Sequence, residues 1–188
     1  MMAPISLPVD PVLSHAMGAA LAVVLLSGAW QKLKEQDVFA AALENYRLLP
    51  AATVGWTARL LPLVEALAGA LLLFQSTRLP AALLAFALLF LATSAVAINL
   101  LRGYSEIECG CGGLGGGIGD QSISWGLVAR NLVLIAAIPW IAAESTLREL
   151  VWMDYLTVAC ATLALLGLYA LASQLLATQP RLSALRNS

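Results

Sequence analysis

Five long apolar runs dominate the hydrophobic pattern of this chain, and each is close to the roughly 20 residues that a helix needs to cross a bilayer. Charged side chains gather between these runs or at their ends, and they are rare inside them. The pattern is typical of transmembrane helices, because a helix satisfies its backbone hydrogen bonds within its own segment. We predict spans at residues 12–30, 52–74, 79–101, 125–143 and 152–177.

The overall composition agrees with a membrane protein. Hydrophobic residues make up 61% of the chain, charged residues 11%, and the mean hydropathy is +0.86, whereas a soluble domain carries about 25% charged residues. We therefore predict an all-α membrane protein in which residues 1–188 form a single integral membrane domain in contact with lipid. The net charge of -1 gives no argument for nucleic-acid binding.

The connections between the predicted spans are unequal in length. The second and fourth are short, and the first and third carry most of the polar sequence. With five spans, the first and third connections lie on the same side of the membrane. In the first connection, Phe39 and Tyr46 recur near helical spacing, Asp37 can cap a helix, and Pro50 can end it. We predict a short interfacial helix within residues 37–49.

The third connection contains two cysteines in a glycine-rich segment. The run CGCGGLGGGIG at residues 109–119 holds seven of the fourteen glycines, and Cys109 and Cys111 are one residue apart. An extended chain separates such Cα atoms by about 7 Å, while a disulfide needs about 4.4–6.8 Å. Gly110, with Gly112 and Gly113 behind the pair, permits the positive φ that a tight bridge requires. We expect an exposed, strained and therefore easily exchanged disulfide.

Charged residues near this loop and inside the spans are the other candidates for chemistry. Arg59, Arg102 and Arg130 are predicted on the cysteine side, where cations stabilise a thiolate, although as anchors at span ends they need no such role. Glu65 falls inside the second predicted span, so its carboxyl must be protonated or paired. It either handles protons or is a neutral carboxyl bonded within the bundle, with a partner on another span such as Asn99 or His15.

The remaining cysteine and histidine are less suggestive. Cys160 lies about 10 to 12 Å inside from the opposite side of the membrane by its position in the fifth span. We expect it to be a packing residue that does not reach the other two cysteines. His15 is near the start of the first span on that same opposite side, so it is a poor base or metal ligand for them. No metal site is predicted from these residues.

Several segments together resemble the methylamine utilisation protein MauE family, over residues 12–143. The family's CGCGG element matches residues 109–113, and the other elements are shared more loosely with the DoxX-like superfamily of small membrane bundles. Those other elements are SGAWQKL at 27–33, NYRLLP at 45–50, and PLVE at 62–65 followed by Gly69. The resemblance implies a DoxX-like four-helix transmembrane core at 12–143, with residues 152–177 as an additional fifth helix.

The resemblance also implies a function in methylamine metabolism. The family is linked to maturation of the periplasmic methylamine dehydrogenase small (beta) subunit, which is rich in disulfides and carries a tryptophan tryptophylquinone cofactor. A thioredoxin-like MauD-type protein is the expected partner, and the expected location is the bacterial inner membrane. Cys109 and Cys111 would be the redox-active pair, acting by thiol-disulfide exchange or within a non-catalytic maturation scaffold. The sequence specifies no cofactor of this chain itself, and a redox role leaves room for a quinone.

The distribution of positive charge bears on which side the cysteines face. Eight Lys and Arg residues are predicted on the cysteine side and two on the other, which by the positive-inside rule favours the cytoplasm. Oxidative folding instead requires the periplasm. We expect a periplasmic loop, because Lys32, Lys34, Arg47 and Arg59 flank the interfacial helix and can reflect packing.

A second function remains open at this point. A CxC pair can present soft thiolates to a metal ion, and Glu65 could mark a pathway through the bundle, as in a membrane carrier or metal-binding protein. Two sulfurs fill only half of a tetrahedral site, and no histidine or third cysteine is predicted nearby. Thiol-disulfide exchange is therefore the leading hypothesis, and soft-metal binding is the alternative.

Overall fold

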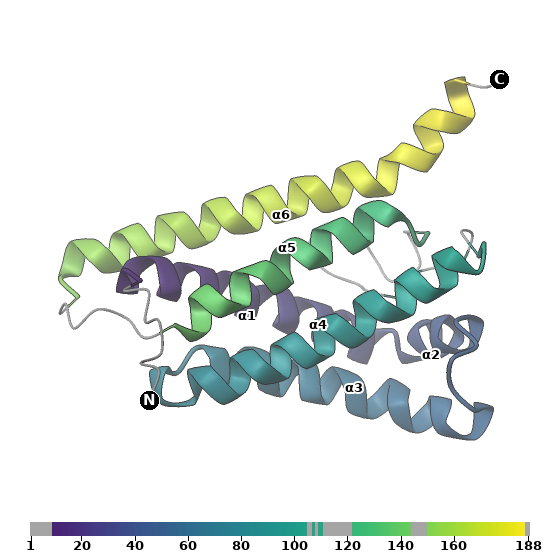
Figure 1. Cartoon of the computed structure of the whole chain (residues 1–188), viewed down its shortest axis with the longest axis horizontal. Helices are drawn as coiled ribbons and strands as arrows, with labels where there is room; N and C mark the ends of the chain where they lie inside the picture. Colours follow the sequence, from purple (N-terminus) through teal and green to yellow (C-terminus); the bar gives the residue numbers. More distant parts are fainter. Residues whose placement is uncertain (1–8, 105–106, 108, 111–121, 144–149, 187–188) are drawn as a thin grey trace, which may run out of the picture.

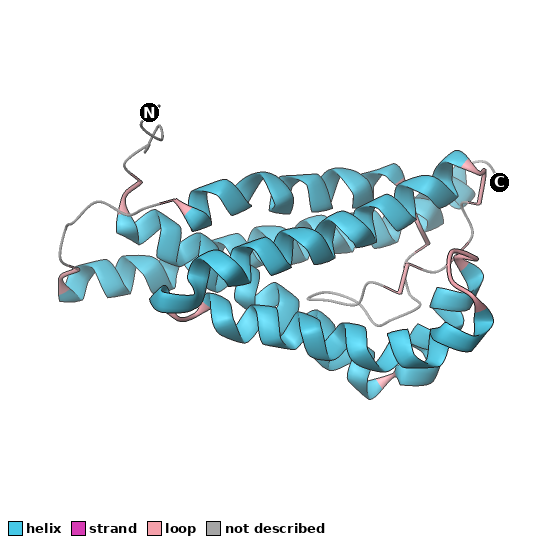
Figure 2. Cartoon of the chain, turned by 60° about the horizontal axis from the view of Figure 1, so that its bottom comes forward, coloured by secondary structure: helices cyan, strands magenta, loops and turns pink. Residues whose placement is uncertain are grey.

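The computed structural model describes residues 9–104, 107, 109–110, 122–143 and 150–186, with side chains to residue 178. In these ranges the chain is helical and contains no β-strand, which confirms the predicted all-α class. Five helices are long and apolar enough to cross a membrane, and they lie side by side along the long axis of the molecule (Figure 1 and Figure 2). The helices are α1 (Pro11–Lys34), α2 (Gln36–Asn45), α3 (Ala51–Leu72), η1 (Gln75–Thr77), α4 (Arg78–Leu101), α5 (Trp125–Ala142) and α6 (Trp152–Arg186).

The spanning helices differ in how deeply they are buried. More than half of the apolar window of α1 is buried (56%), against 6% of the window of α6. Helix α1 is therefore the central helix, and α6 lies at the edge with large apolar side chains such as Leu163 and Leu168 exposed. Such an apolar surface is what lipid tails cover in a membrane. The C-terminal end of α6 extends away from the other helices (Figure 1).

Small residues set the close packing of α1 against α3. A Cβ atom added at Gly69 of α3 would lie 3.0 Å from Cγ of Leu26 and 3.1 Å from the carbonyl oxygen of Ala22. Small side chains at such contacts let membrane helices approach closely and gain van der Waals contact. The main core continues from this contact into α4 and α5, and its buried members are Leu21, Ala22, Leu25, Ala68, Leu72, Ala81, Ala82, Ala85, Leu89, Ile138 and Ile141.

The short helix predicted in the first connection is present as α2, with different ends. It begins one residue after Glu35, which occupies the N-cap position without a capping side-chain bond, so the prediction that Asp37 caps the helix is wrong. The helix ends at Asn45, well before Pro50, because Arg47 adopts a left-handed backbone with φ of 51°. Pro50 instead directly precedes α3, where a proline ring does not disturb helical bonding.

Candidate functional site

The first and third connections meet at one end of the bundle, as predicted for odd-numbered connections between spans that alternate in direction. The Tyr46 hydroxyl, just after α2, donates a hydrogen bond of 2.9 Å to the carbonyl oxygen of Cys109. Gly110 lies directly against α2, since a Cβ atom added there would be 2.9 Å from Cβ of Ala42 and 3.5 Å from Cδ2 of Phe39. Phe39, Ala42 and Tyr46 follow one another at helical spacing, so a single side of α2 supports the Cys109–Gly110 segment.

Gly110 is required at its position for two independent reasons. Its φ is +62°, a conformation that residues with a Cβ atom adopt only at a cost. Its contact with Ala42 also leaves no room for a side chain. The prediction that Gly110 supplies a positive φ next to Cys109 is therefore confirmed, and the close approach to α2 is a second role that the sequence did not indicate.

Cys109 is buried, which corrects the expectation of an exposed loop at this residue. Its exposed fraction is 6%, and it belongs to an apolar cluster with Val96 of α4 and Leu127 of α5. The Tyr46 hydrogen bond draws its backbone inward. A backbone hydrogen bond of 2.9 Å from the Ile123 amide to the Ile107 carbonyl also joins the two ends of the connection. The cysteine is thus part of the packed end of the bundle.

Tyr46 is a neutral hydrogen-bond donor at this site. Burial raises the pKa of Tyr46 well above its ordinary value, because an apolar setting disfavours the phenolate. The hydroxyl proton is therefore retained over the physiological pH range, and the Cys109 carbonyl keeps its donor.

The remaining site residues predicted from the sequence are the rest of the cysteine loop and three arginines. The three arginines are dispersed in the structure. Cys111, Gly112 and Gly113 lie outside the described residues. Arg59 and Arg102 are exposed. Arg130 turns toward α6, where Nη1 donates to Oγ of Ser173 at 3.1 Å and the guanidinium lies 5.1 Å from the ring centroid of Tyr169. Its position is explained by helix packing between α5 and α6.

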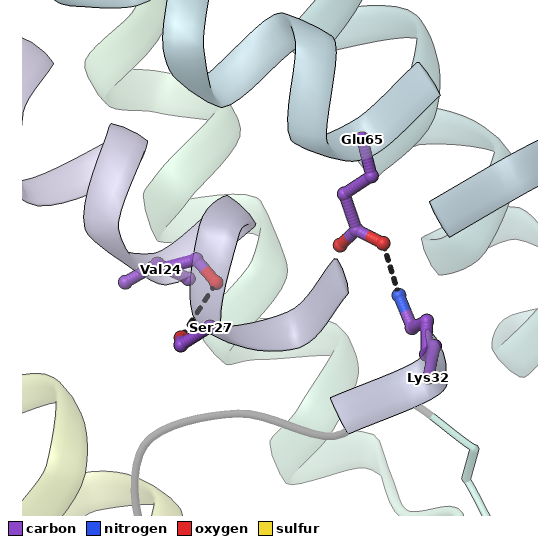
Figure 3. A network of polar contacts seen from close by, with 4 residues as sticks. All are labelled: Val24, Ser27, Lys32 and Glu65. Carbon is purple, nitrogen blue, oxygen red and sulfur yellow. Dashed lines mark hydrogen bonds and ion pairs between the residues drawn. The ribbon is translucent and has the colours of Figure 1, made fainter. Parts of the chain in front are cut away.

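Glu65 is paired with Lys32, not with Asn99 or His15. Lys32 Nζ lies 2.5 Å from Oε2 of Glu65, and the two side chains are 10% and 13% exposed. Figure 3 shows the two side chains pointing toward each other from α1 and α3, while the Ser27 hydroxyl bonds to Val24 within α1. Helix α3 lies close to α1 at Gly69, and the long side chain of Lys32, in the last turn of α1, reaches the carboxylate.

The two residues first suggested as partners of Glu65 are engaged elsewhere. The Asn99 side-chain amide donates to the Ala95 carbonyl at 3.0 Å within α4. His15 Nδ1 lies 2.6 Å from the Pro11 carbonyl at the other end of α1. Of the two alternatives for Glu65, a protonated or a paired carboxyl, the structure shows the paired one, and neither suggested partner is correct.

Lys32 is the residue that the sequence analysis missed, since it was counted only among the cations of the cysteine side. Its ammonium group also lies 5.5 Å from the centroid of the Phe39 ring on α2. The available signal in the sequence was a basic residue in the last turn of one apolar span and an acid inside a neighbouring span. That signal could not reveal the pairing, because it does not say which sides of the two helices face each other.

Cys160 is far less engaged than Cys109. It is a free, exposed cysteine on α6, so the expectation that it is a packing residue is wrong. Among the described residues no group of three or more His, Cys, Asp and Glu side chains is arranged to hold a metal ion.

Comparisons with known proteins confirm the resemblance seen in the sequence. The family described as methylamine utilisation protein MauE matches residues 10–144. The methylamine utilization protein MauE of Paracoccus denitrificans is 38% identical over 130 residues, which cover 68% of this chain and 67% of that protein. The protein of that name from Methylophilus methylotrophus is 40% identical over 102 residues, or 54% of each chain. The one from Paracoccus versutus is 36% identical over 127 residues, which cover 68% of this chain and 67% of that protein.

No solved structure matches the chain, so the DoxX-like relationship of the core stays a prediction. The match at 10–144 spans α1 to α5 and includes Tyr46, Glu65 and both loop cysteines. The chain belongs to the MauE family, whose members are proteins of the methylamine utilisation system.

Proposed function

We propose that this protein supports disulfide formation in the small subunit of methylamine dehydrogenase, by thiol-disulfide exchange at Cys109 and Cys111. A thioredoxin-like protein of the MauD type is the expected redox partner. The proposal joins family membership to the chemistry of two thiols separated by one glycine. The cysteine pair lies within the part of the chain that matches the family.

The observation that carries the proposal is the anchoring of Cys109. Its carbonyl accepts a hydrogen bond from Tyr46, its neighbour Gly110 packs on α2, and its side chain lies in an apolar cluster. A cysteine with no role in a connecting segment needs none of these supports. A redox pair benefits from them, because a fixed backbone holds one sulfur in a set position while the other reacts.

The proposed exchange balances without an additional cofactor. A thiolate of the client attacks the oxidised pair, one sulfur of the pair leaves, and a mixed disulfide forms. The second client thiolate then displaces the pair, which becomes a dithiol, while the client gains a disulfide and its two thiol protons are released to the reduced pair. The disulfide of the thioredoxin-like partner reoxidises the pair by the same two steps. Burial of Cys109 favours Cys111 as the sulfur that the client attacks.

The site is proposed to face the periplasm, on the outer side of the bacterial inner membrane. The positive-inside rule counts cations of the loops, and two of the cations on the cysteine side are engaged in packing. Lys32 pairs with Glu65, and Arg130 contacts Ser173 and Tyr169, whereas Lys34, Arg47 and Arg59, also expected to reflect packing, are exposed. These contacts weaken the charge argument for a cytoplasmic loop, and oxidative folding of a periplasmic client requires the opposite placement.

The carrier or metal-binding alternative receives less support. Glu65 was its marker of a pathway through the bundle, and that carboxylate is paired with Lys32. A charge that is neutralised by a neighbouring helix stabilises the bundle and is not free to accept a substrate ion.

The test is complementation in a methylamine-using host that lacks this protein. Parent, Cys109→Ser, Cys111→Ser and the double variant are compared, with Cys160→Ser as the matched control. The redox state of the small-subunit cysteines is read by thiol alkylation and mass spectrometry, alongside methylamine dehydrogenase activity. We expect reduced client cysteines in all three loop variants and parent behaviour for Cys160→Ser, because Cys160 lies exposed on α6.

Two outcomes would contradict the proposal. A fully oxidised, active client in the double serine variant would remove exchange at this pair, and a scaffold role would then be favoured. Stoichiometric metal retained by the purified parent and lost in the double variant would favour the binding alternative. Sidedness is read in the same strain with a membrane-impermeant thiol reagent applied after reduction.

A further inference from the structure

We propose that the Lys32–Glu65 ion pair positions the Cys109–Gly110 segment for exchange, acting through the Phe39 ring on α2. The ion pair lies inside the bundle between α1 and α3, whereas the cysteine segment lies at the end of the bundle. Three successive contacts join the ion pair to the cysteine segment. The inference rests on the proposed function for its use, and its geometry stands independently of that function.

The first contact fixes the position of the lysine side chain. Lys32 Nζ and Glu65 Oε2 are 2.5 Å apart, and Lys32 is 8% exposed. A lone charge at this depth is costly, so the two groups hold each other in place. Gly69 keeps α1 and α3 close one turn beyond Glu65, which sets the distance that the lysine side chain must bridge.

The second contact passes from the ion pair to α2. The Lys32 ammonium lies 5.5 Å from the centroid of the Phe39 ring. Phe39 is 4% exposed and packs with Ala58 of α3 in a small separate cluster. A cation over an aromatic ring attracts it electrostatically, more strongly where water is excluded. The orientation of Phe39 therefore depends on where the ion pair holds the ammonium group.

The third contact passes from Phe39 to the cysteine segment. The ring atoms Cδ2 and Cε2 lie 3.5 Å and 3.7 Å from the place where a Cβ of Gly110 would be. Ala42 approaches the same place to 2.9 Å. Phe39 and Ala42 together form the surface of α2 on which Gly110 lies, so a shift of the Phe39 ring changes the support of this residue. Cys109 precedes Gly110 and is held by Tyr46 on the same side of α2.

A purely structural ion pair would act differently. It would join α1 to α3 and contribute to the stability of the bundle, with no dependence on which residue carries the positive charge. A positioning pair requires the cation on α1, because only there does it lie over Phe39. The two roles are therefore separable by exchanging the charges.

The experiment uses the full chain in lipid nanodiscs and two measurements. One is the thermal unfolding midpoint. The other is hydrogen exchange of the amides at the closed ends of the cysteine connection, including Ile123, which donates to Ile107 at 2.9 Å. The variants are K32E/E65K, Phe39→Leu and Lys32→Arg.

The control variant is Tyr169→Leu, which removes a part-buried cation-aromatic contact between Arg130 of α5 and α6. We expect K32E/E65K to keep the parent unfolding midpoint, because an ion pair is preserved, while the connection exchanges about 2- to 30-fold faster. Phe39→Leu should give the same acceleration, and Lys32→Arg should behave like the parent. Tyr169→Leu should leave the connection unchanged.

The inference is overturned if, in K32E/E65K or Phe39→Leu, the amides at the ends of the cysteine connection undergo hydrogen exchange at the parent rate. It is also overturned if Tyr169→Leu accelerates that exchange as much as Phe39→Leu does. Failure of the proposed function is seen in a different experiment, as normal oxidation of the client without Cys109 and Cys111. That result does not depend on the hydrogen exchange rates measured here. Faster hydrogen exchange in these variants, together with normal client oxidation in the double serine variant, would support the positioning contact and contradict thiol-disulfide exchange at the cysteine pair.

Discussion

Replacing Tyr46 by Phe removes one hydroxyl and leaves the aromatic ring, so it tests the contact that joins the two connections. The hydroxyl donates to the Cys109 carbonyl at 2.9 Å across a sequence separation of 63. Tyr46 is 7% exposed and Cys109 is 6% exposed, so water does not readily replace the lost donor. The phenyl ring can keep its place in the cluster with Val96 and Leu127.

The size of the effect follows from the carbonyl that is left unpaired. A buried acceptor without its donor costs about 1–3 kcal/mol. Since about 1.4 kcal/mol is a factor of ten, the opening equilibrium of the Cys109 segment should rise by about 5- to 150-fold. The core of α1, α3, α4 and α5 is separate from this cluster, so the protection of their central amides should not change.

Hydrogen exchange measured by mass spectrometry on the full chain in nanodiscs provides the assay. Peptides that cover residues 104–110 and 122–127 should exchange faster by the factor above, and central peptides of α4 should not. Tyr155→Phe is the matched control, because Tyr155 is 63% exposed on α6. If both variants exchange at the parent rate in 104–110, the Tyr46 hydroxyl does not hold the segment and the reasoning is wrong.

The pH dependence of this contact has a definite sign. Burial raises the pKa of Tyr46 above its ordinary value of 10.0, so the neutral form is favoured in the folded protein. The contribution to stability is fully present below pH 10 and is lost as pH rises through the folded-state pKa. The difference in tyrosinate absorbance between parent and Tyr46→Phe should therefore be absent at pH 10, where a free tyrosine is half ionised, and appear only at higher pH.

Three further outcomes are expected. Gly110→Ala should release the cysteine segment from α2. Adding Ala42→Gly should restore only part of the contact, because the positive φ alone costs about 1–2 kcal/mol. Hydrogen exchange of residues 104–110 measures both effects. Gly69→Ala should destabilise the bundle by about 1–3 kcal/mol in chemical unfolding, whereas Gly55→Ala, with open space around it, should not. With Ser at the other two cysteines, Cys109 should react with maleimide slowly when folded and rapidly in denaturant, and equal rates would contradict its burial.

The sequence alone determined the helices and the side on which the key connections meet. Run length and hydropathy are local properties, and each spanning helix must satisfy its own backbone hydrogen bonds. The predicted spans therefore agree with α1, α3, α4, α5 and α6 to within a few residues at most ends, apart from the longer C-terminal end of α6. Because successive spans alternate in direction, the first and third connections had to lie on the same side, where the structure brings Cys109 to Tyr46.

The sequence also indicated the one position where glycine is essential next to Cys109. A residue between two close cysteines needs an unusual backbone, and Gly110 has φ of +62°. The family resemblance followed from short segments with specific residues, and it was confirmed over residues 10–144. These features depend on neighbours in the chain or on direct comparison of residues.

Only the tertiary structure decided which side chains meet inside the bundle. Lys32 and Glu65 are 33 positions apart, and their pairing depends on how α1 and α3 are rotated about their own axes. A helix that is apolar on nearly every side gives little sign of which side faces a neighbour, because lipid and protein interior are equally apolar. For the same reason the burial of Cys109 was missed: a glycine-rich connection looks exposed in sequence, and only its packing on α2 and against α4 and α5 encloses it.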